Sequence, residues 1–370
     1  MFFEHIGEGI DKNSIPKNLE IELNKRMSRT ISEVRADTKD GVCFHCGKPV
    51  TSFCNSLNVP HFCLENIGVD GKVTGPNAIL GLPSMGISIG KEFPGIGEAG
   101  TFRIICRECD SKIFQEYENP DNYYKATPPT QKMLAEMAMK NYLKFISKRK
   151  FEIALLEKTL EQCPQSGIEY YFEKTELETR LKTSRIDLDA YINEYRYAKK
   201  YASKDNNNGF YIIYYRLLDY VVPVAIQAPI AVSIDLEGNV VNDIVNMDPG
   251  YKLVDLHLCV FPLKSQTAII LFINEGEKRY RKFYKQFRKL TEDGKLSVIN
   301  YLIFLYCEDY FLAKELPSKV DLRQLKNIAS LTPVAWDVRP ITHASAYAEE
   351  FTLSKWNCIP NLLSERYKVR

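Results

Sequence analysis

Four cysteines in the first third of the chain have the types and spacing of a metal site. They form two Cys-x-x-Cys pairs, Cys43 with Cys46 and Cys106 with Cys109. Two residues between the thiols let both sulfurs of a pair face one ion, and zinc takes four such ligands in a tetrahedron. Gly47 follows the first pair, and glycine is the residue that a tight turn at this point favours. The sequence therefore predicts one structural zinc ion held by these four side chains.

Further residues of metal-binding type lie between the two pairs, namely Cys54, His61 and Cys63. A second ion, or an exchange of ligands with the first, is one interpretation of this group. The other is that Cys54 and Cys63 are small buried hydrophobic residues, which is how free cysteines usually behave. We favour the second interpretation.

The segments around the second pair predict the elements that position the ligands. Phe102, Ile104 and Ile105 precede this pair and are typical of a strand. Residues 110–117 follow it and predict a helix with Ile113 and Phe114 turned inward. A strand, a zinc knuckle and a helix in this order form the second half of a treble-clef domain.

Three motifs in residues 41–120 carry a resemblance to a known family. They are Cys43-x-x-Cys46, then Ser56-Leu57-Asn58-Val59-Pro60-x-Phe62, then Cys106-x-x-Cys109-Asp110 continued by Ile113-Phe114-x-x-x-Glu118. Together they resemble the HNH-like treble-clef zinc domain of uncharacterised bacterial proteins. This resemblance implies a nuclease, in which a histidine activates water and an Mg²⁺ or Mn²⁺ ion holds the scissile phosphate.

The chain departs from that family at the position of the general base. Leu57 stands where the resemblance places the histidine, and leucine neither accepts a proton nor binds a metal. Three explanations remain open: an inactive domain that only binds, a base supplied by another residue such as His61, or an inactivating change at position 57.

Asp110 and Glu118 are the residues that the resemblance implies as ligands of the catalytic metal. Their eight-residue separation would put them about two turns apart on one face of a helix. The alternative is that Asp110 caps the helix and Glu118 faces solvent.

Residues 277–290 predict an amphipathic helix with one aromatic and one basic side. The apolar stripe consists of Tyr280, Phe283, Tyr284, Phe287 and Leu290. The opposite side carries the candidate nucleic-acid-binding residues Lys278, Arg281, Lys282, Lys285, Arg288 and Lys289. A basic face of this kind binds phosphates through counterion release, or it is a solvated face whose stems cover the helix. We favour the solvated face.

Two smaller charged groups are interpreted as surface features. Lys144, Lys148, Arg149 and Lys150 form a weaker basic group. Glu308 and Asp309 are a carboxylate pair, but neighbouring residues on a helix do not face each other.

The composition is that of an ordinary globular protein. The chain has 370 residues, 45% of them hydrophobic, and a formal net charge of +2. Such a small net charge excludes attraction of the whole molecule to nucleic acid, so any such binding requires a local patch. The sequence shows no signal peptide and no transmembrane helix, and we therefore expect a cytoplasmic protein with reduced thiols and no membrane association.

The pattern of elements predicts an α+β fold in three regions. We expect an HNH-like treble-clef zinc domain over residues 1–125, a helical region over 126–204 and an α+β domain over 205–370. Expected helices cover residues 17–35, 130–150, 150–162, 174–202, 277–290 and 295–314. Expected strands cover residues 210–217, 231–235, 256–261 and 267–274, and their direct succession predicts an antiparallel sheet.

These features predict a zinc-binding, HNH-like protein that engages DNA or RNA. Its most specific form is a degenerate metal-dependent endonuclease of bacterial antiphage defence, where the defence role rests on analogy alone. The alternative is a non-catalytic interaction module with a purely structural zinc, which binds a protein partner or a second copy through the C-terminal domain. Leu57 favours this alternative.

Overall fold

The computed structural model describes most of the chain, with several gaps. The described residues are 25, 29–34, 41–76, 93–125, 127–162, 168–203, 208–244, 246, 248, 250–329 and 351–370. The helix expected at residues 17–35 lies largely outside them, and its described part, residues 29–34, is helical.

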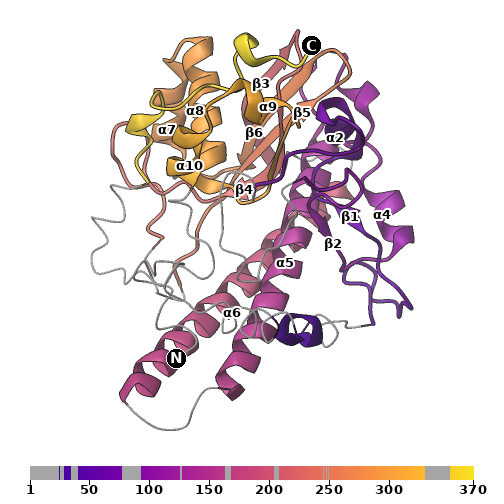
Figure 1. The fold of residues 1–370 in the computed structure, drawn as a ribbon, viewed down its shortest axis with the longest axis vertical. Coiled ribbons are helices and arrows are strands. Elements are labelled where there is room, and N and C mark those ends of the chain that lie inside the picture. The colour runs from indigo at the N-terminus through magenta and orange to yellow at the C-terminus, as the bar shows by residue number, and fades with distance from the viewer. Residues whose placement is uncertain are drawn as a thin grey trace.

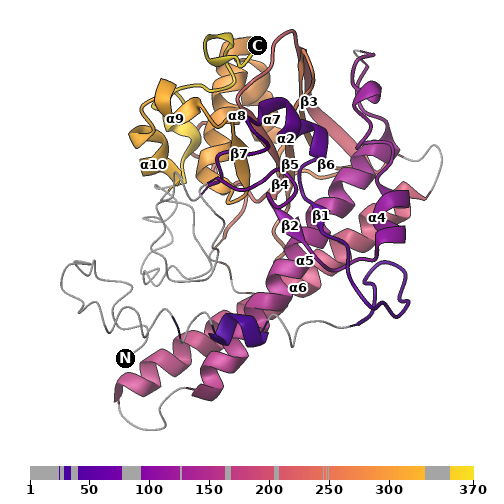
Figure 2. The ribbon, with the colours of Figure 1, turned by 45° about the vertical axis from the view of Figure 1, so that its right-hand side comes forward.

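Two long helices form a hairpin that projects from the body of the molecule (Figures 1 and 2). They are α5 (Gln131–Gln162) and α6 (Ile168–Ala202). The two helices expected over residues 130–162 are therefore one, because no glycine or proline interrupts this segment. Near the far end of the hairpin, Leu156 packs with Leu177 and Leu181.

A five-stranded sheet forms the centre of the C-terminal part, and all of its neighbouring strands are antiparallel. Its order is β3-β6-β5-β4-β7. The strands are β3 (Phe210–Leu218), β4 (Val224–Ile230), β5 (Leu256–Pro262), β6 (Thr267–Asn274) and β7 (Tyr310–Leu312). The predicted antiparallel sheet is confirmed.

Two details of the predicted sheet are wrong. The strand expected at residues 231–235 is replaced by β4, which ends at Ile230. Gln227 and Pro229 argue against a strand locally, but every residue of β4 is buried between two layers. The helix expected to reach residue 314 ends at Tyr306, and β7 follows it at the edge of the sheet.

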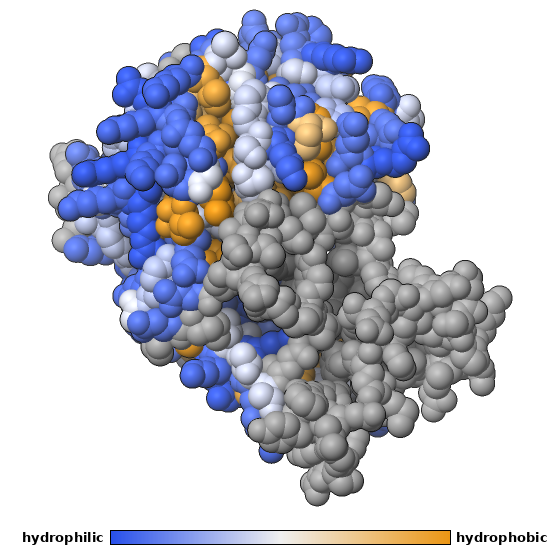
Figure 3. Space-filling view, turned by 90° about the vertical axis from the view of Figure 1, so that its left-hand side faces the viewer, coloured by the Kyte–Doolittle hydropathy of each residue, from blue (hydrophilic) through white to orange (hydrophobic). Residues whose placement is uncertain are grey.

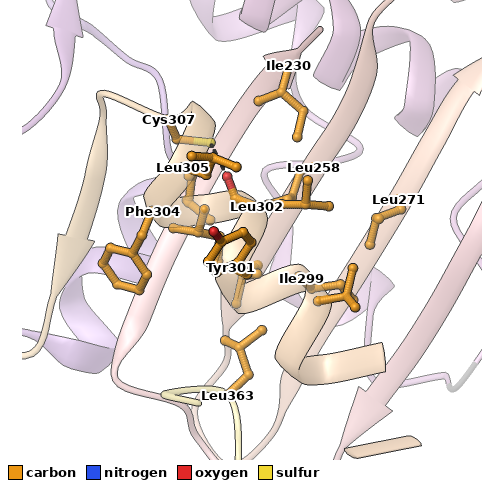
Figure 4. Close-up of a cluster of buried hydrophobic side chains, with 14 of the residues drawn as sticks. Ile230, Leu258, Leu271, Ile299, Tyr301, Leu302, Phe304, Leu305, Cys307 and Leu363 are labelled. Carbon is orange, nitrogen blue, oxygen red and sulfur yellow. Dashed lines mark hydrogen bonds between the residues drawn. The ribbon is translucent and has the colours of Figure 1, made fainter. Parts of the chain in front are cut away.

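Helices cover both faces of the sheet, so the fold has three layers. On one face lie α7 (Arg281–Arg288) and α8 (Glu292–Tyr306), and Figure 4 shows Ile299 and Leu302 of α8 near Leu258 and Leu271 of the sheet. Alternate strand residues point to the other face, where Phe261 and Phe272 join a second core with α5.

Short helices complete the C-terminal layer beside α8. They are α9 (Leu316–Lys319), α10 (Arg323–Ala329), η3 (Leu353–Lys355) and η4 (Glu365–Tyr367). The side of the molecule on which α7 and α10 lie is mostly hydrophilic where its residues are described (Figure 3).

The N-terminal region packs against the same sheet. Its elements are β1 (Ser56–Leu57), α2 (His61–Ile67), β2 (Thr101–Phe102), α4 (Arg107–Ile113) and η2 (Pro120–Asn122). Thr74 pairs with Leu312 of β7 through two backbone hydrogen bonds of 2.9 Å. Cys63 and Tyr117 share the second core with Phe261. In the described parts of the chain, no helix combines the length and apolarity needed to cross a bilayer.

Candidate metal centre and the charged groups around it

The four predicted zinc ligands converge. The ligand atoms of Cys43, Cys46, Cys106 and Cys109 all lie within 4.8 Å of one another. A zinc-centred tetrahedron with Zn–S bonds of about 2.3 Å places its sulfurs about 3.8 Å apart, so the four thiols fit this ion. They are the one group of this kind among the residues that the structure describes. Cys54, His61 and Cys63 do not form a second group of converging ligand atoms.

Backbone geometry orients the two pairs toward each other. Gly47 adopts a positive φ of 71° and donates a 2.8 Å hydrogen bond to the Cys43 carbonyl, which closes the first turn. Cys106 is the N-cap of α4, and its sulfur accepts from the backbone N–H of Cys109 at 3.4 Å. The backbone N–H of Cys106 reaches the Cys43 sulfur at 3.3 Å. Both knuckles therefore expose their sulfurs to one centre.

Backbone N–H groups near Cys43 favour the ionised form of its thiol. Burial opposes ionisation of this thiol, but backbone N–H groups of Cys46, Cys106 and His45 lower its pKa to about 7. Because zinc binds the thiolate, a lowered pKa favours the ligand form.

The first knuckle is attached to α6. The Tyr195 hydroxyl and His45 Nδ1 lie 2.5 Å apart, and the Lys199 ammonium donates to the His45 carbonyl at 2.9 Å. The Tyr195 ring also contacts Phe44 edge to face, with centroids 5.3 Å apart. Burial and the nearby Lys199 charge lower the pKa of His45 to about 4, so the imidazole is neutral at pH 7. The metal centre therefore depends on α6 for its position.

Asp110 and Glu118 do come together, although they do not share a helix face. Helix α4 ends at Ile113, so Glu118 lies beyond it. Both carboxylates accept hydrogen bonds from Lys140 of α5, each at 2.9 Å from its Nζ. The Lys140 side chain is 1% exposed, and its ammonium also lies 4.1 Å from the Phe114 ring centroid. A buried ammonium thus occupies the position between the two carboxylates.

Asp110 has two further partners in the N-terminal region. Its Oδ1 accepts from the Ser56 hydroxyl at 2.5 Å, and its Oδ2 accepts from the Cys54 thiol at 3.4 Å. Burial opposes ionisation of Asp110, but the Lys140 charge and the Ser56 hydrogen bond hold its pKa below the usual value. The alternative of a helix-capping Asp110 is wrong, because Cys106 fills that place. Cys54 is a half-buried hydrogen-bond donor rather than a buried hydrophobic residue, whereas Cys63 is fully buried.

Lys140 is the residue that sequence reasoning missed. Met133, Met137 and Asn141 form a buried face of α5, and Lys140 lies three residues after Met137 on that face. A lysine on an otherwise buried face predicts a buried partner, which is the signal that would have identified it.

The other two candidate catalytic positions lie in different settings. Leu57 is half-buried on β1, where it pairs with Thr101 of β2. His61 is the first residue of α2 and not part of a strand. Its side chain is 55% exposed, and its Nδ1 lies 3.3 Å from the Glu65 carboxylate.

The basic group around residue 148 is engaged in ion pairs within the molecule. Lys144 pairs with Asp309 at 3.3 Å, and Lys148 pairs with Glu308. Arg149 pairs with Asp187 of α6 at 2.9 Å. Glu308 and Asp309, which the sequence indicates as surface charges, are 33% and 31% exposed, and each pairs with a cation of α5.

The basic face of α7 has the opposite character. Its apolar stripe packs into the core with Tyr280, Phe283 and Phe287 buried, as the sequence predicts. α7 is shorter than the predicted helix over residues 277–290, so Lys278 precedes it and Lys289 is its C-cap. All six cations are exposed. They are Lys278, Arg281, Lys282, Lys285, Arg288 and Lys289. Over the described part of the chain, none of these cations has a carboxylate within 4.0 Å.

Comparisons with known proteins give no family for the chain. No protein-family model matches it, and no curated protein or solved structure matches it.

Proposed function

We propose that this chain is a zinc-stabilised, HNH-like treble-clef protein that binds DNA or RNA through α7 and does not hydrolyse it. The order of motifs around the four clustered cysteines supports the treble clef and the HNH-like class. A role in antiphage defence rests on the same resemblance.

The unpaired cations of α7 carry the binding part of this proposal. Elsewhere, buried and half-buried lysines such as Lys140 and Lys144 are neutralised by carboxylates of the same chain. The six cations on and beside α7 are instead exposed and free of ion pairs among the described residues. A fixed row of such charges gains affinity for phosphates by releasing counterions from the nucleic acid.

Two residues argue against hydrolysis. Leu57 supplies no general base, and a positioned base typically contributes about 10²- to 10⁴-fold to such a reaction. The Lys140 ammonium already pairs with both Asp110 and Glu118, so these carboxylates have a cationic partner within the chain.

Charge reversal on α7 tests the binding. We expect Lys282→Glu, Lys285→Glu and Lys289→Glu together to reduce affinity for oligonucleotides by more than about tenfold at low salt. The slope of log affinity against log salt should fall by about 2 to 3, because three phosphate contacts are lost. Fluorescence anisotropy over a salt titration measures both quantities.

The matched control changes three exposed lysines on other elements by the same total charge. Lys125, Lys264 and Lys355 are exposed and lie outside α7. If this control weakens binding as much as the α7 variant, the effect is one of net charge and the assignment to α7 is wrong.

The remaining outcomes separate the alternatives. Cleavage of DNA or RNA by the unchanged protein with Mg²⁺ or Mn²⁺ contradicts the non-hydrolytic part of the proposal. Absence of any binding at low salt contradicts the nucleic-acid part. The protein-interaction module then becomes the better hypothesis.

A further inference from the structure

An aromatic group borders the basic face of α7. Tyr211 of β3 contacts Tyr284 of α7 edge to face, with ring centroids 5.7 Å apart and planes at 87°. The Arg288 guanidinium lies 5.4 Å from the Tyr284 ring centroid. Aromatic rings and unpaired cations therefore meet at one place on the surface, where α7 packs beside the edge strand β3.

The orientation of Tyr211 is fixed although the residue is exposed. Its hydroxyl donates a 3.1 Å hydrogen bond to the Tyr284 hydroxyl, and Tyr284 in turn packs against the core below α7. Tyr211 is nevertheless 41% exposed, which makes it one of the few large hydrophobic side chains with that much surface in water among the described residues. A ring held in this way loses little conformational entropy when a flat ligand stacks on it.

Tyr211 lies on an edge strand of the sheet. β3 pairs with β6 on one side, and among the described strands it has no neighbour on the other. Arg216, on the same strand, is also exposed and adds a further cation to this edge.

We propose that Tyr211 stacks an unpaired base, so that the α7 surface takes single-stranded nucleic acid in preference to duplex. This inference rests on the proposed nucleic-acid binding by α7. Surfaces for single strands combine a row of cations with exposed aromatic rings, because every unpaired base offers a flat face for stacking. A base inside a duplex is stacked on both sides and offers no such face, whereas phosphates are available in both forms.

Replacement of Tyr211 tests the inference. We expect Tyr211→Ala to weaken binding of a single-stranded oligonucleotide of about 20 nucleotides by roughly 5- to 150-fold, the range for loss of one stacked base. Binding of the same sequence as a duplex should be unchanged, and so should the salt dependence, because no charge is removed. Fluorescence anisotropy measures all three.

Two variants separate stacking from structural effects. Tyr211→Phe keeps the ring and loses only the hydrogen bond to Tyr284, so it should retain single-strand affinity within about twofold. Tyr124→Ala removes another tyrosine, which is 38% exposed, and should change neither affinity. A melting curve of each variant checks that it is folded.

The possible failures are distinguishable. If Tyr211→Ala leaves single-strand affinity unchanged while the α7 charge reversal abolishes it, α7 binds phosphates and the stacking inference is wrong. If Tyr211→Ala weakens duplex and single strand equally, the ring supports α7 instead of reading a base, which also overturns the inference. If the unchanged protein binds neither form, the proposed function itself fails.

Discussion

At the scale of single residues, a buried chain of polar side chains joins α5 to β5. Asn141 Nδ2 donates to His257 Nδ1 at 3.1 Å, and Tyr142 lies 3.4 Å from His257 Nε2. The Tyr142 hydroxyl donates to Asp255 at 3.0 Å. Burial lowers the pKa of His257 to about 3, so the ring is neutral. Because Nδ1 accepts from an amide, the proton of the ring lies on Nε2.

Asp255 makes the stability of the protein depend on pH. Burial raises its pKa to about 7, and the negative charges of Glu194 and Asp187 act in the same direction. The folded state therefore holds this proton at pH values where the unfolded chain has lost it. The contribution of Asp255 is full below about pH 4, the unfolded pKa, and is lost as the pH rises through about 7.

We expect Asp255→Asn to remove this part of the pH dependence, because asparagine accepts the Tyr142 hydrogen bond without ionising. As the pH rises from 4.5 to 8, the free energy of unfolding of the variant should increase relative to that of the unchanged protein by up to about 1–2 kcal/mol. This figure allows for partial contact of Asp255 with solvent. Urea unfolding at several pH values measures it. Burial also raises the pKa of Glu136 to about 7, so the free energy of unfolding of both proteins still changes with pH. Asp219→Asn, at an exposed position, is the control. If it changes the pH dependence of stability in the same way, the assignment to Asp255 is wrong.

Lys140 is the second residue whose replacement has a defined outcome. We expect Lys140→Met to lower the free energy of unfolding by about 2–4 kcal/mol, since Asp110 and Glu118 are left without a counter-charge. The figure lies below that for a fully buried pair because these side chains are 21% and 34% exposed. The loss of stability is measured as a lower denaturant midpoint, while the dependence of the free energy of unfolding on denaturant concentration stays the same.

Two comparisons make the Lys140 result specific. Lys132 lies on the same helix as Lys140 and forms an exposed ion pair with Glu116. Lys132→Met should lower the free energy of unfolding by less than about 1 kcal/mol. Adding Asp110→Asn and Glu118→Gln to Lys140→Met should recover part of the stability, because no uncompensated charge remains. If the triple variant is less stable than Lys140→Met, charge compensation is not what Lys140 provides.

At the scale of elements, α5 connects the layers through its cations. Successive charges along it pair with different segments: Lys140 with the N-terminal region, Lys144 with the turn before β7 and Arg149 with α6. Each cation of this series faces a carboxylate from outside α5, so the helix is held in one position relative to three neighbours.

The zinc knuckle is the element whose stability should depend most on a ligand. We expect the purified protein to contain about one zinc per chain and Cys43→Ser or Cys109→Ser to release it. Residues 41–125 should then unfold, because structural zinc contributes directly to folding free energy. Metal analysis and hydrogen exchange over these residues measure the two effects.

Cys358→Ser is the matched control, since Cys358 is an exposed thiol outside the cluster. It should leave the zinc content and the exchange pattern unchanged. A carefully reduced protein that contains no zinc would contradict the assignment of the four ligands.

At the scale of the whole molecule, the net charge is only +2, although a group of exposed cations lies around α7. Lys144 and Lys148 of α5 pair with carboxylates of the same chain, whereas the cations around α7 are turned to water. The sheet between these helices keeps them on opposite sides (Figure 1). The proposed nucleic-acid binding therefore concerns one face of the molecule, and its strength should fall as ionic strength rises.

The sequence alone determined the features that depend on short-range spacing. Two Cys-x-x-Cys pairs predicted the cluster, and the helical repeat of residues 277–290 predicted which side of α7 is buried. Alternating β-branched and aromatic residues predicted β3, β5 and β6 within a few residues. Each of these patterns is complete within a segment, so local sequence is sufficient.

The tertiary structure decided what depends on distant partners. β4 has the composition of a poor strand and forms one because both of its faces are covered. Glu308 and Asp309 look like surface charges until α5 lies beside them. Lys140 finds its carboxylates 30 and 22 residues earlier in the chain. Only packing brings such groups together, because the free energy of a buried charge is set by its neighbours in space and not by those in sequence.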